Sequence, residues 1–187
     1  MKCITLALIL FAGTASAAVA PEIVHEGSVT VTKIREPKKE LRMEVQVPGS
    51  RDSVWQAFTT SAGLDSWLWK DCSVDLRRGG GWLVHFSGSS TGGGTIERFK
   101  RGREITIHAM APESFPTVRS KGTTAVFRFE ALGDTATRVR LVQTGWQRGE
   151  EWDNAYEYLA RGNAQLLGQL RRRFETGPID WAAADKK

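Results

Sequence analysis

The clearest hydrophobic periodicity in the chain runs from Glu150 to Phe174. Its apolar residues recur at intervals of three and four, the spacing of one face of an α-helix. Acidic residues begin this stretch and arginines end it, as the helix dipole favours, and Gly177-Pro178 then ends the helix. The sequence predicts a long C-terminal helix. Its predicted inner face consists of Trp152, Tyr156, Leu159, Asn163, Leu166, Leu167, Leu170 and Phe174.

Asn163 is the polar member of this otherwise apolar face. A buried amide needs hydrogen-bond partners or water. Asn163 therefore either faces a cavity, or it bonds to a neighbouring strand or lies at the edge of the face. Gly162 and Gly168 are each unfavourable in a helix by roughly 1 kcal/mol relative to alanine, and they indicate places where backbone or ligand comes close.

The first half of the chain predicts two strands and two short helices. Apolar and polar residues alternate over Val29 to Ile34 and over Leu41 to Val47, the period of a strand. We expect residues 21 to 26 to be a mobile terminus. Ser50 and Ser61 are placed to cap two short helices, the second of which runs to Trp67.

Short alternating segments separated by glycine-rich turns follow, and they predict an antiparallel meander. In its last hairpin, Phe127 and Phe129 are expected to face Leu141 and Val139. A glycine-rich turn is predicted over 88–94 and a long loop over Ala111 to Lys121. A sheet of this length must curl and bury one face, and the C-terminal helix is long enough to cover it. The predicted strands are 72–76, 81–87, 95–100, 104–110, 124–130 and 137–144.

The first twenty residues have the pattern of a secretory signal peptide. Lys2 precedes an apolar run from Ile4 to Phe11, and small residues allow cleavage after Ala17 or Ala20. This run is too short to span a membrane. We therefore expect a periplasmic or secreted protein. The mature chain keeps one cysteine, Cys72, so no internal disulfide is expected.

The formal net charge of +5 does not predict nucleic-acid binding. The basic residues are scattered singly or in pairs, and the triplet Arg171-Arg172-Arg173 is explained by the end of a helix. We expect no specific nucleic-acid partner. Oligomeric state cannot be read from the sequence.

Several segments together resemble one known superfamily. They are Val47 to Phe58 (VPGSRDSVWQAF), Trp67, Asp75 to Gly80 (DLRRGG), and Thr144-Gly145-Trp146 before the long helix. Their order is similar to that of the START-like, helix-grip superfamily (SRPBCC), and in particular to the branch named after the activator of the heat-shock-protein-90 ATPase. The resemblance covers about Lys39 to Phe174.

The resemblance implies an α+β helix-grip fold: a curved antiparallel sheet wrapped around a long C-terminal helix, with two short helices after the first strand. It also implies a deep apolar cavity between sheet and helix, but no fixed catalytic set, because the superfamily mixes carriers, cyclases and other functions. The expected division is a signal peptide (1–20), an N-terminal segment with a possible extra strand (21–38), the helix-grip domain (39–176) and a tail (177–187).

Motifs for catalysis or metal binding are weak. His25, His85 and His108 lack metal-ligand spacing, so neither a metal nor another cofactor is expected. Residues 88–92 match G-x-S-x-G, but a strand follows where a nucleophile elbow requires a helix, which favours a hairpin loop. No catalytic residue is predicted.

We therefore expect a non-catalytic domain that binds a small hydrophobic or amphipathic molecule between sheet and helix. One alternative is a cyclase or hydrolase that uses an inward-facing His85 or His108. Another is a protein-interaction module that uses an exposed apolar patch on the 111–121 loop, with a filled interior. The predicted cavity lining consists of Trp67, Trp82, Phe86, Phe127, Phe129, Leu141, Gln143, Trp146, Tyr156, Leu159 and Asn163.

Overall fold

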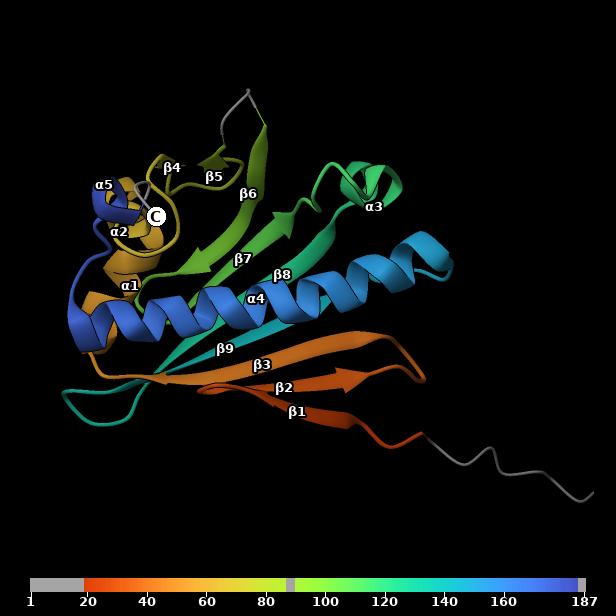
Figure 1. The fold of residues 1–187 in the computed structure, drawn as a ribbon, viewed down its shortest axis with the longest axis horizontal. Coiled ribbons are helices and arrows are strands. Elements are labelled where there is room, and N and C mark those ends of the chain that lie inside the picture. The colour runs from red at the N-terminus through yellow and green to blue at the C-terminus, as the bar shows by residue number, and fades with distance from the viewer. Residues whose placement is uncertain (1–18, 87–89, 185–187) are drawn as a thin grey trace, which may run out of the picture.

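The computed structural model describes residues 19–86 and 90–184. Within these ranges a single sheet is accompanied by helices along one of its faces (Figure 1). The strands are β1 (Glu22–Glu26), β2 (Val29–Ile34), β3 (Glu40–Val47), β4 (Cys72–Val74), β5 (Gly81–His85), β6 (Thr91–Lys100), β7 (Glu104–Ala109), β8 (Thr123–Ala131) and β9 (Thr137–Thr144). The helices are α1 (Arg51–Thr59), α2 (Ser61–Asp65), α3 (Pro116–Lys121), α4 (Glu150–Thr176) and α5 (Trp181–Ala184).

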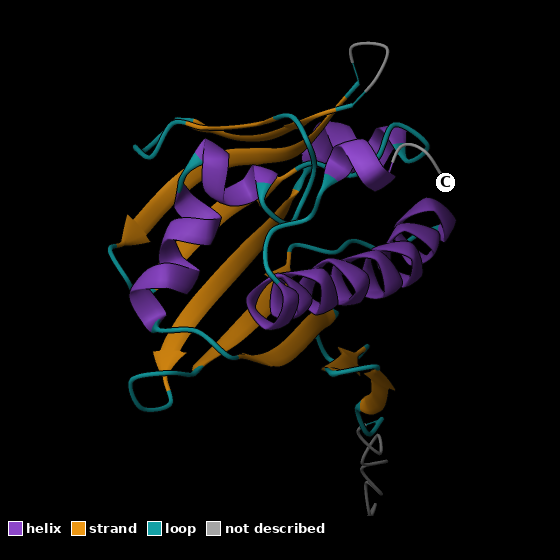
Figure 2. Ribbon diagram, turned by 60° about the vertical axis from the view of Figure 1, so that its left-hand side comes forward, coloured by secondary structure: helices purple, strands orange, loops and turns teal. Residues whose placement is uncertain are grey.

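The sheet has the order β1-β2-β3-β9-β8-β7-β6-β5-β4, and every neighbouring pair is antiparallel. It curves, and both α1 and α4 lie on its concave side (Figure 2). In the β8–β9 pair, Phe127 faces Leu141 and Phe129 faces Val139, as predicted. The α+β helix-grip fold expected from the sequence is therefore confirmed.

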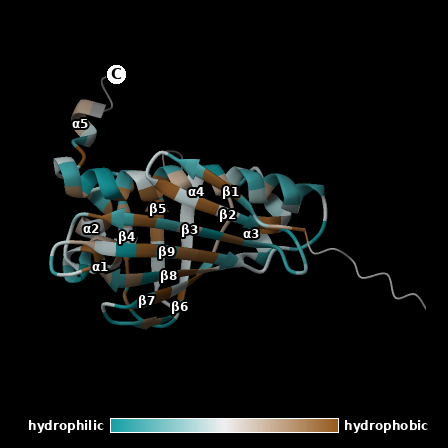
Figure 3. Ribbon diagram, turned by 90° about the horizontal axis from the view of Figure 1, so that it is seen from below, coloured by the Kyte–Doolittle hydropathy of each residue, from teal (hydrophilic) through white to brown (hydrophobic). Residues whose placement is uncertain are grey.

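Alternation along the strands separates the two faces of the sheet. On β3, Leu41, Met43, Val45 and Val47 are buried, whereas the residues between them are exposed or half-buried. Hydrophobic and hydrophilic positions accordingly alternate along the strands in Figure 3. The convex face carries cross-strand ion pairs, such as the 2.8 Å contact between Arg140 Nε and Glu44 Oε2. Apolar residues thus collect on the side that α4 covers.

The residues that α4 buries differ in part from those predicted. Ala155, Ala160 and Ala164 are buried, and these small side chains allow the helix to lie close to the sheet. Leu159 and Leu166, which we expected to be buried, are only partly so. Gly162 and Gly168 have no neighbouring atom within 4 Å of an added Cβ, so the expectation of a close backbone approach there was wrong.

Residues 22–26 form strand β1, and the expectation of a mobile terminus was wrong there. β1 pairs with β2 from Glu22↔Lys33 to Glu26↔Val29. The Glu157 side chain on α4 accepts hydrogen bonds of 2.7 Å from both Lys33 and Arg35. The N-terminal strands are therefore also tied to the helix by charged groups.

The predicted glycine-rich turn is also corrected, because Gly92, Gly93 and Gly94 belong to strand β6. A Cβ on Gly94 would lie 2.1 Å from the His108 carbonyl oxygen, and one on Gly93 would lie 2.0 Å from that of Trp82. The glycines thus allow neighbouring strands to approach closely. Residues 87–89 lie outside the described ranges, and with them part of the G-x-S-x-G match.

Two further corrections concern the cap of α2 and the long loop. Ser50 caps α1 as predicted, but α2 is capped by Thr60, whose hydroxyl accepts a 2.9 Å hydrogen bond from the Gly63 amide. The predicted 111–121 loop contains α3. The C-terminal tail packs on α2, where Trp181 Nε1 donates to the Asp65 carbonyl at 2.5 Å.

The predicted signal peptide lies almost wholly outside the described residues, which begin at Val19. Among the described helices, none has the length and apolar character needed to cross a bilayer. Cys72 is buried, and burial raises the pKa of its thiol to about 12, so the thiol stays protonated at neutral pH.

Candidate functional site

One end of the concave face is filled by aromatic side chains around Phe58. This residue on α1 is 0% exposed, and its ring centroid lies 5.0 to 5.1 Å from those of Trp67, Phe127 and Phe129. The indole of Trp67 donates to the Ala57 carbonyl at 2.9 Å, and that of Trp82 donates to the Phe58 carbonyl at 2.8 Å. Trp67, Trp82 and Phe129 are buried there and form core.

The middle of the interface contains a short chain of polar side chains. Gln143 on β9 is 2% exposed, and its amide donates to the Thr123 hydroxyl at 2.8 Å. Asn163 on α4 donates to the Gln143 side-chain oxygen at 3.0 Å. The structure thus brings the two predicted polar groups together, and it supports the interpretation that Asn163 bonds to a neighbouring strand. Leu141, two residues before Gln143, is buried.

Tyr156 on α4 lies toward the end of the concave face that is opposite to the Phe58 cluster. Its side chain is fully buried, and its hydroxyl donates to the Glu40 carbonyl at 2.9 Å. Burial raises the pKa of Tyr156 to about 12, so the hydroxyl remains a donor at neutral pH. Trp146 packs edge-on against it, with ring centroids 5.0 Å apart, and donates from Nε1 to the Gln143 carbonyl at 3.0 Å. These contacts hold Trp146 in place.

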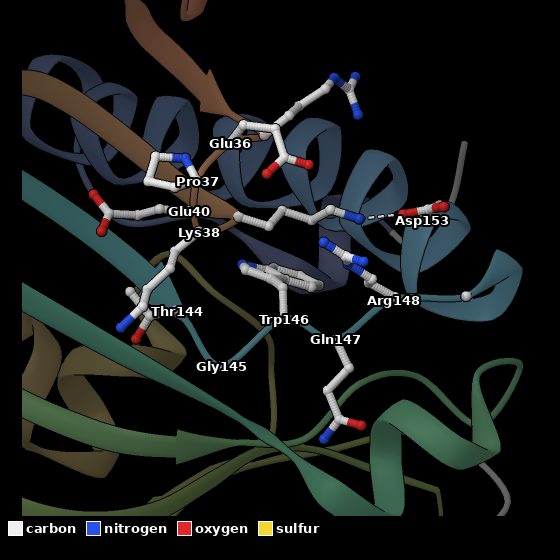
Figure 4. A pocket seen from close by; sticks show the side chains of 13 residues that line it. Glu36, Pro37, Lys38, Glu40, Thr144, Gly145, Trp146, Gln147, Arg148 and Asp153 are labelled. Carbon is white, nitrogen blue, oxygen red and sulfur yellow. Dashed lines mark hydrogen bonds and ion pairs between the residues drawn. The ribbon is translucent and has the colours of Figure 1, made fainter. Parts of the chain in front are cut away.

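Beyond Trp146 the molecule opens into a cavity of about 1120 Å³, which we call the Trp146 cavity (Figure 4). It lies between the β2–β3 turn, the β9–α4 loop and the first turns of α4. Its lining includes both polar and apolar groups. The lining residues are Arg35, Glu36, Pro37, Lys38, Lys39, Glu40, Thr144, Gly145, Trp146, Gln147, Arg148, Gly149 and Asp153.

Most charged groups of this cavity are already paired. Lys39 binds Asp153 across the opening, a contact marked in Figure 4. Arg35 binds Glu157 at 2.7 Å, and the Glu40 carboxylate binds Arg42. Lys38 and Arg148 are exposed and have no carboxylate within 4.0 Å among the described residues. They are therefore available to a ligand.

The loop that carries Trp146 and Arg148 has glycines at both ends. Gly145 and Gly149 have φ values of 90° and 125°, where a side chain would strain the backbone. Beside the loop, Glu151 accepts backbone hydrogen bonds from Thr117 at 2.6 Å and Val118 at 3.0 Å. The hydrogen bond from Thr117 lowers the pKa of the Glu151 carboxyl. Glu151 thus caps α3 and holds it against α4.

Among the eleven predicted lining residues, Trp146 is the one that lines the Trp146 cavity. Phe127, Leu159 and Asn163 are partly exposed, although the strand partners of Phe127, Ile105 and Leu141, are buried. Phe86 is 42% exposed and packs on Trp69 at 5.4 Å, near the other end of the sheet. The other six residues are Trp67, Trp82, Phe129, Leu141, Gln143 and Tyr156, and all are buried.

Neither histidine considered as an inward acid or base faces α4. His85 alternates with the buried Val84, so it lies on the convex side, where its Nε2 is 2.9 Å from the Ser73 hydroxyl. His108 follows the buried Ile107, and its Nδ1 is 3.9 Å from a Glu97 oxygen. The structure thus removes both groups on which the cyclase or hydrolase alternative depended. The described residues include no cluster of three or more metal-ligating side chains.

Most apolar side chains of the segment 111–121 pack against α4. Ala111 and Val118 are buried and pack with Trp152 and Ala155 of α4. Phe115 lies 5.4 Å from Tyr158, measured between ring centroids. The apolar side chains of this segment therefore hold α3 against α4.

The polar part of the Trp146 cavity was not predicted from the sequence. Residues 35 to 40 and Arg148 form no periodic pattern and no motif. The available signal was the glycine-flanked segment Gly145 to Gly149 before a long helix, which places Trp146 in a loop. The charged residues of the β2–β3 turn meet this loop only because β3 pairs with β9.

A curved antiparallel sheet that holds a long C-terminal helix, with two short helices after an early strand, defines a helix-grip protein. Residues 48–175 match the family described as Activator of Hsp90 ATPase homolog 1-like protein, and this chain belongs to that family. No curated protein sequence matches the chain.

Solved structures with the same fold are distant in sequence. The Aha1 dimer from Colwellia psychrerythraea is 21% identical with a TM-score of 0.60, over 74% of this chain and 97% of that one. PFC0360w, an HSP90 activator from Plasmodium falciparum, is 17% identical with a TM-score of 0.59, over 75% and 97%. CalU16 from Micromonospora echinospora is 20% identical with a TM-score of 0.56, over 87% and 88%. At these identities the likeness concerns the fold.

Proposed function

We propose that this protein is an exported domain that binds a small amphipathic molecule at the Trp146 cavity. The observation that carries the proposal is a cavity of about 1120 Å³ that lies against the ring of Trp146, at the open end of a helix-grip fold. Ligand sites in proteins are concave, with apolar walls and a few polar groups that set orientation. The Trp146 cavity offers the apolar surfaces of Trp146 and Pro37 beside many charged and polar groups, which suits an amphipathic molecule.

The apolar part of the ligand would lie against Trp146 and continue toward the partly exposed apolar groups of the concave face. Leu159 on α4 is such a group. Each 100 Å² of apolar surface removed from water contributes about 2.5 kcal/mol to binding. Asn163, whose amide nitrogen is bound to Gln143, keeps its amide oxygen as an acceptor for a polar group of the ligand.

Two observations favour binding over catalysis. His85 and His108 lie on the convex face, away from the interface with α4. Tyr156, a titratable group at the inner end of the Trp146 cavity, has a pKa of about 12 and is engaged with the Glu40 carbonyl, so it is a poor base at neutral pH. Export is supported by the signal-peptide pattern of residues 1–20.

The first test is expression of the full chain in a bacterium with a periplasm, followed by osmotic-shock fractionation and native mass spectrometry. We expect the periplasmic fraction to contain a chain that begins at residue 18 or 21 and retains a small molecule. An unprocessed cytoplasmic chain would overturn the export proposal. A periplasmic chain that retains nothing and takes up neither 1-dodecanol nor dodecanoate would overturn the binding proposal.

The second test concerns the position of the ligand. Leu159→Gln should weaken 1-dodecanol binding about five-fold, because a half-exposed apolar contact is replaced by an amide. The matched control is Phe99→Gln, which replaces a 36% exposed apolar residue of β6, a strand that contributes no residue to the lining, and it should leave affinity unchanged. Equal effects of the two variants would contradict the proposed path along α4.

A further inference from the structure

We infer that the ligand carries an anionic group, such as a carboxylate, phosphate or sulfate, and that Arg148 binds it, while Lys38, on the other side of Trp146 in Figure 4, adds a second unpaired positive charge to the lining. This inference rests on the proposed function, because it names the chemical class of molecule that the Trp146 cavity accepts. It comes from the charges around the cavity and from which of them are already paired.

The lining contains four cationic side chains and three carboxylates, so its formal charge is 4 − 3 = +1. Several of these charged side chains already have a partner of opposite charge. Lys39 is bound to Asp153, Arg35 to Glu157, and Glu40 to Arg42. Among the described residues, the lining groups left without an ion pair are Lys38, Arg148 and Glu36. Two free cations thus oppose one free carboxylate.

The positions of Trp146 and Arg148 suit an amphipathic acid. In Figure 4 both side chains lie on the same side of the β9–α4 loop, whereas Gln147 between them points away. An aromatic ring and a guanidinium are thereby presented on the same side of the loop. The ring can contact an apolar body, and the planar guanidinium can donate two parallel hydrogen bonds to a carboxylate or phosphate.

The acidic first turn of α4 would repel an anion if its carboxylates faced the cavity freely. Two of them are occupied elsewhere. Asp153 is bound to Lys39, and Glu151 accepts the backbone amides of Thr117 and Val118. The third acidic residue of this turn, Glu150, is exposed and lies outside the lining, so the unpaired carboxylate within the lining is that of Glu36 on the β2–β3 turn. Its removal should therefore strengthen anion binding.

The test compares two probes with the same twelve-carbon chain, dodecanoate and 1-dodecanol, by isothermal titration of the full mature chain below the micelle concentration. We expect dodecanoate to bind at least ten-fold more tightly. Arg148→Gln should weaken dodecanoate about five-fold and Lys38→Gln somewhat less, with 1-dodecanol unchanged. Glu36→Gln should strengthen dodecanoate by about two-fold.

The matched control is Arg172→Gln, which removes the same charge from an exposed residue in the last turns of α4, and it should change neither affinity. Arg148 and Lys38 are exposed, so thermal unfolding of these variants should match that of the wild type.

The outcomes separate this inference from the proposed function. If neither probe binds, both fail. If the two probes bind equally, or if Arg148→Gln and Arg172→Gln weaken dodecanoate to the same extent, the cavity remains a binding site but its preference for anions is refuted. Tighter binding of dodecyltrimethylammonium than of dodecanoate would refute the anionic class as well.

Discussion

The two ends of the concave face differ in what fills them. At the α1 end, Phe58 lies among Trp67, Trp82, Phe127 and Phe129, and indole nitrogens are bound to carbonyls of α1. At the other end, loops and a turn replace α1, and the Trp146 cavity opens against one indole. Aromatic residues were expected to serve either as core or as cavity lining, and at the α1 end Trp67, Trp82 and Phe129 are buried as core. The proposed binding site therefore lies at the end that α1 and α2 do not cover.

The largest expected effect is at the filled end. Phe58→Ala should lower the free energy of unfolding by about 3–5 kcal/mol, because it leaves a cavity among closely packed rings. Urea denaturation would measure this. Phe86→Ala is the matched control, since Phe86 is 42% exposed, and it should cost less than about 1 kcal/mol. Similar losses for both variants would show that the Phe58 cluster is not closely packed.

A smaller effect is expected where the core meets the Trp146 cavity. Tyr156→Phe removes the donor to the Glu40 carbonyl and should lower the free energy of unfolding by about 1–3 kcal/mol. Tyr158→Phe, on the exposed side of the same helix, should change it by less than about 0.5 kcal/mol. If the two variants were equally stable in urea, the Tyr156 hydroxyl would not hold β3 to α4.

The smallest expected effect lies outside the Trp146 cavity, where Glu157 ties β2 to α4. Burial raises the pKa of Glu157, but hydrogen bonds from Lys33 and Arg35 outweigh it, so the pKa lies below the ordinary value of 4.5. A lowered folded-state pKa contributes stability above pH 4.5, and this contribution is lost as the pH falls through the folded value.

Glu157→Gln should therefore destabilise the protein by less than about 1 kcal/mol at pH 7, since the carboxylate is partly exposed and screened by solvent. The difference from the wild type should shrink below pH 4.5. Urea unfolding at a series of pH values would measure it. A difference that persisted unchanged at pH 3 would contradict an electrostatic origin.

The long helix, the hairpin register and the first helix cap could be predicted because each depends on neighbouring residues. α4 begins at Glu150 as the acidic turn predicts, and Ser50 accepts the Ser53 amide. Three features could not be predicted from neighbouring residues: strand β1, helix α3 and the strand conformation of Gly92 to Gly94. β1 depends on pairing with β2, α3 on a cap from Glu151, and the glycines on contact with β5 and β7.

Membership of a helix-grip family was indicated by the resemblance of several motifs. The order of elements and the inward face of most strands follow from the amino-acid pattern alone, because periodicity is a local property. The open end of the concave face does not follow from this pattern. The Trp146 cavity is made by a turn near residue 38 and a loop near residue 147, and the hydrogen bond from Tyr156 to the lining residue Glu40 joins residues 116 positions apart. Whether such distant segments leave space or fill it depends on how their side chains pack once the sheet has curled around α4, and that is a property of the folded chain.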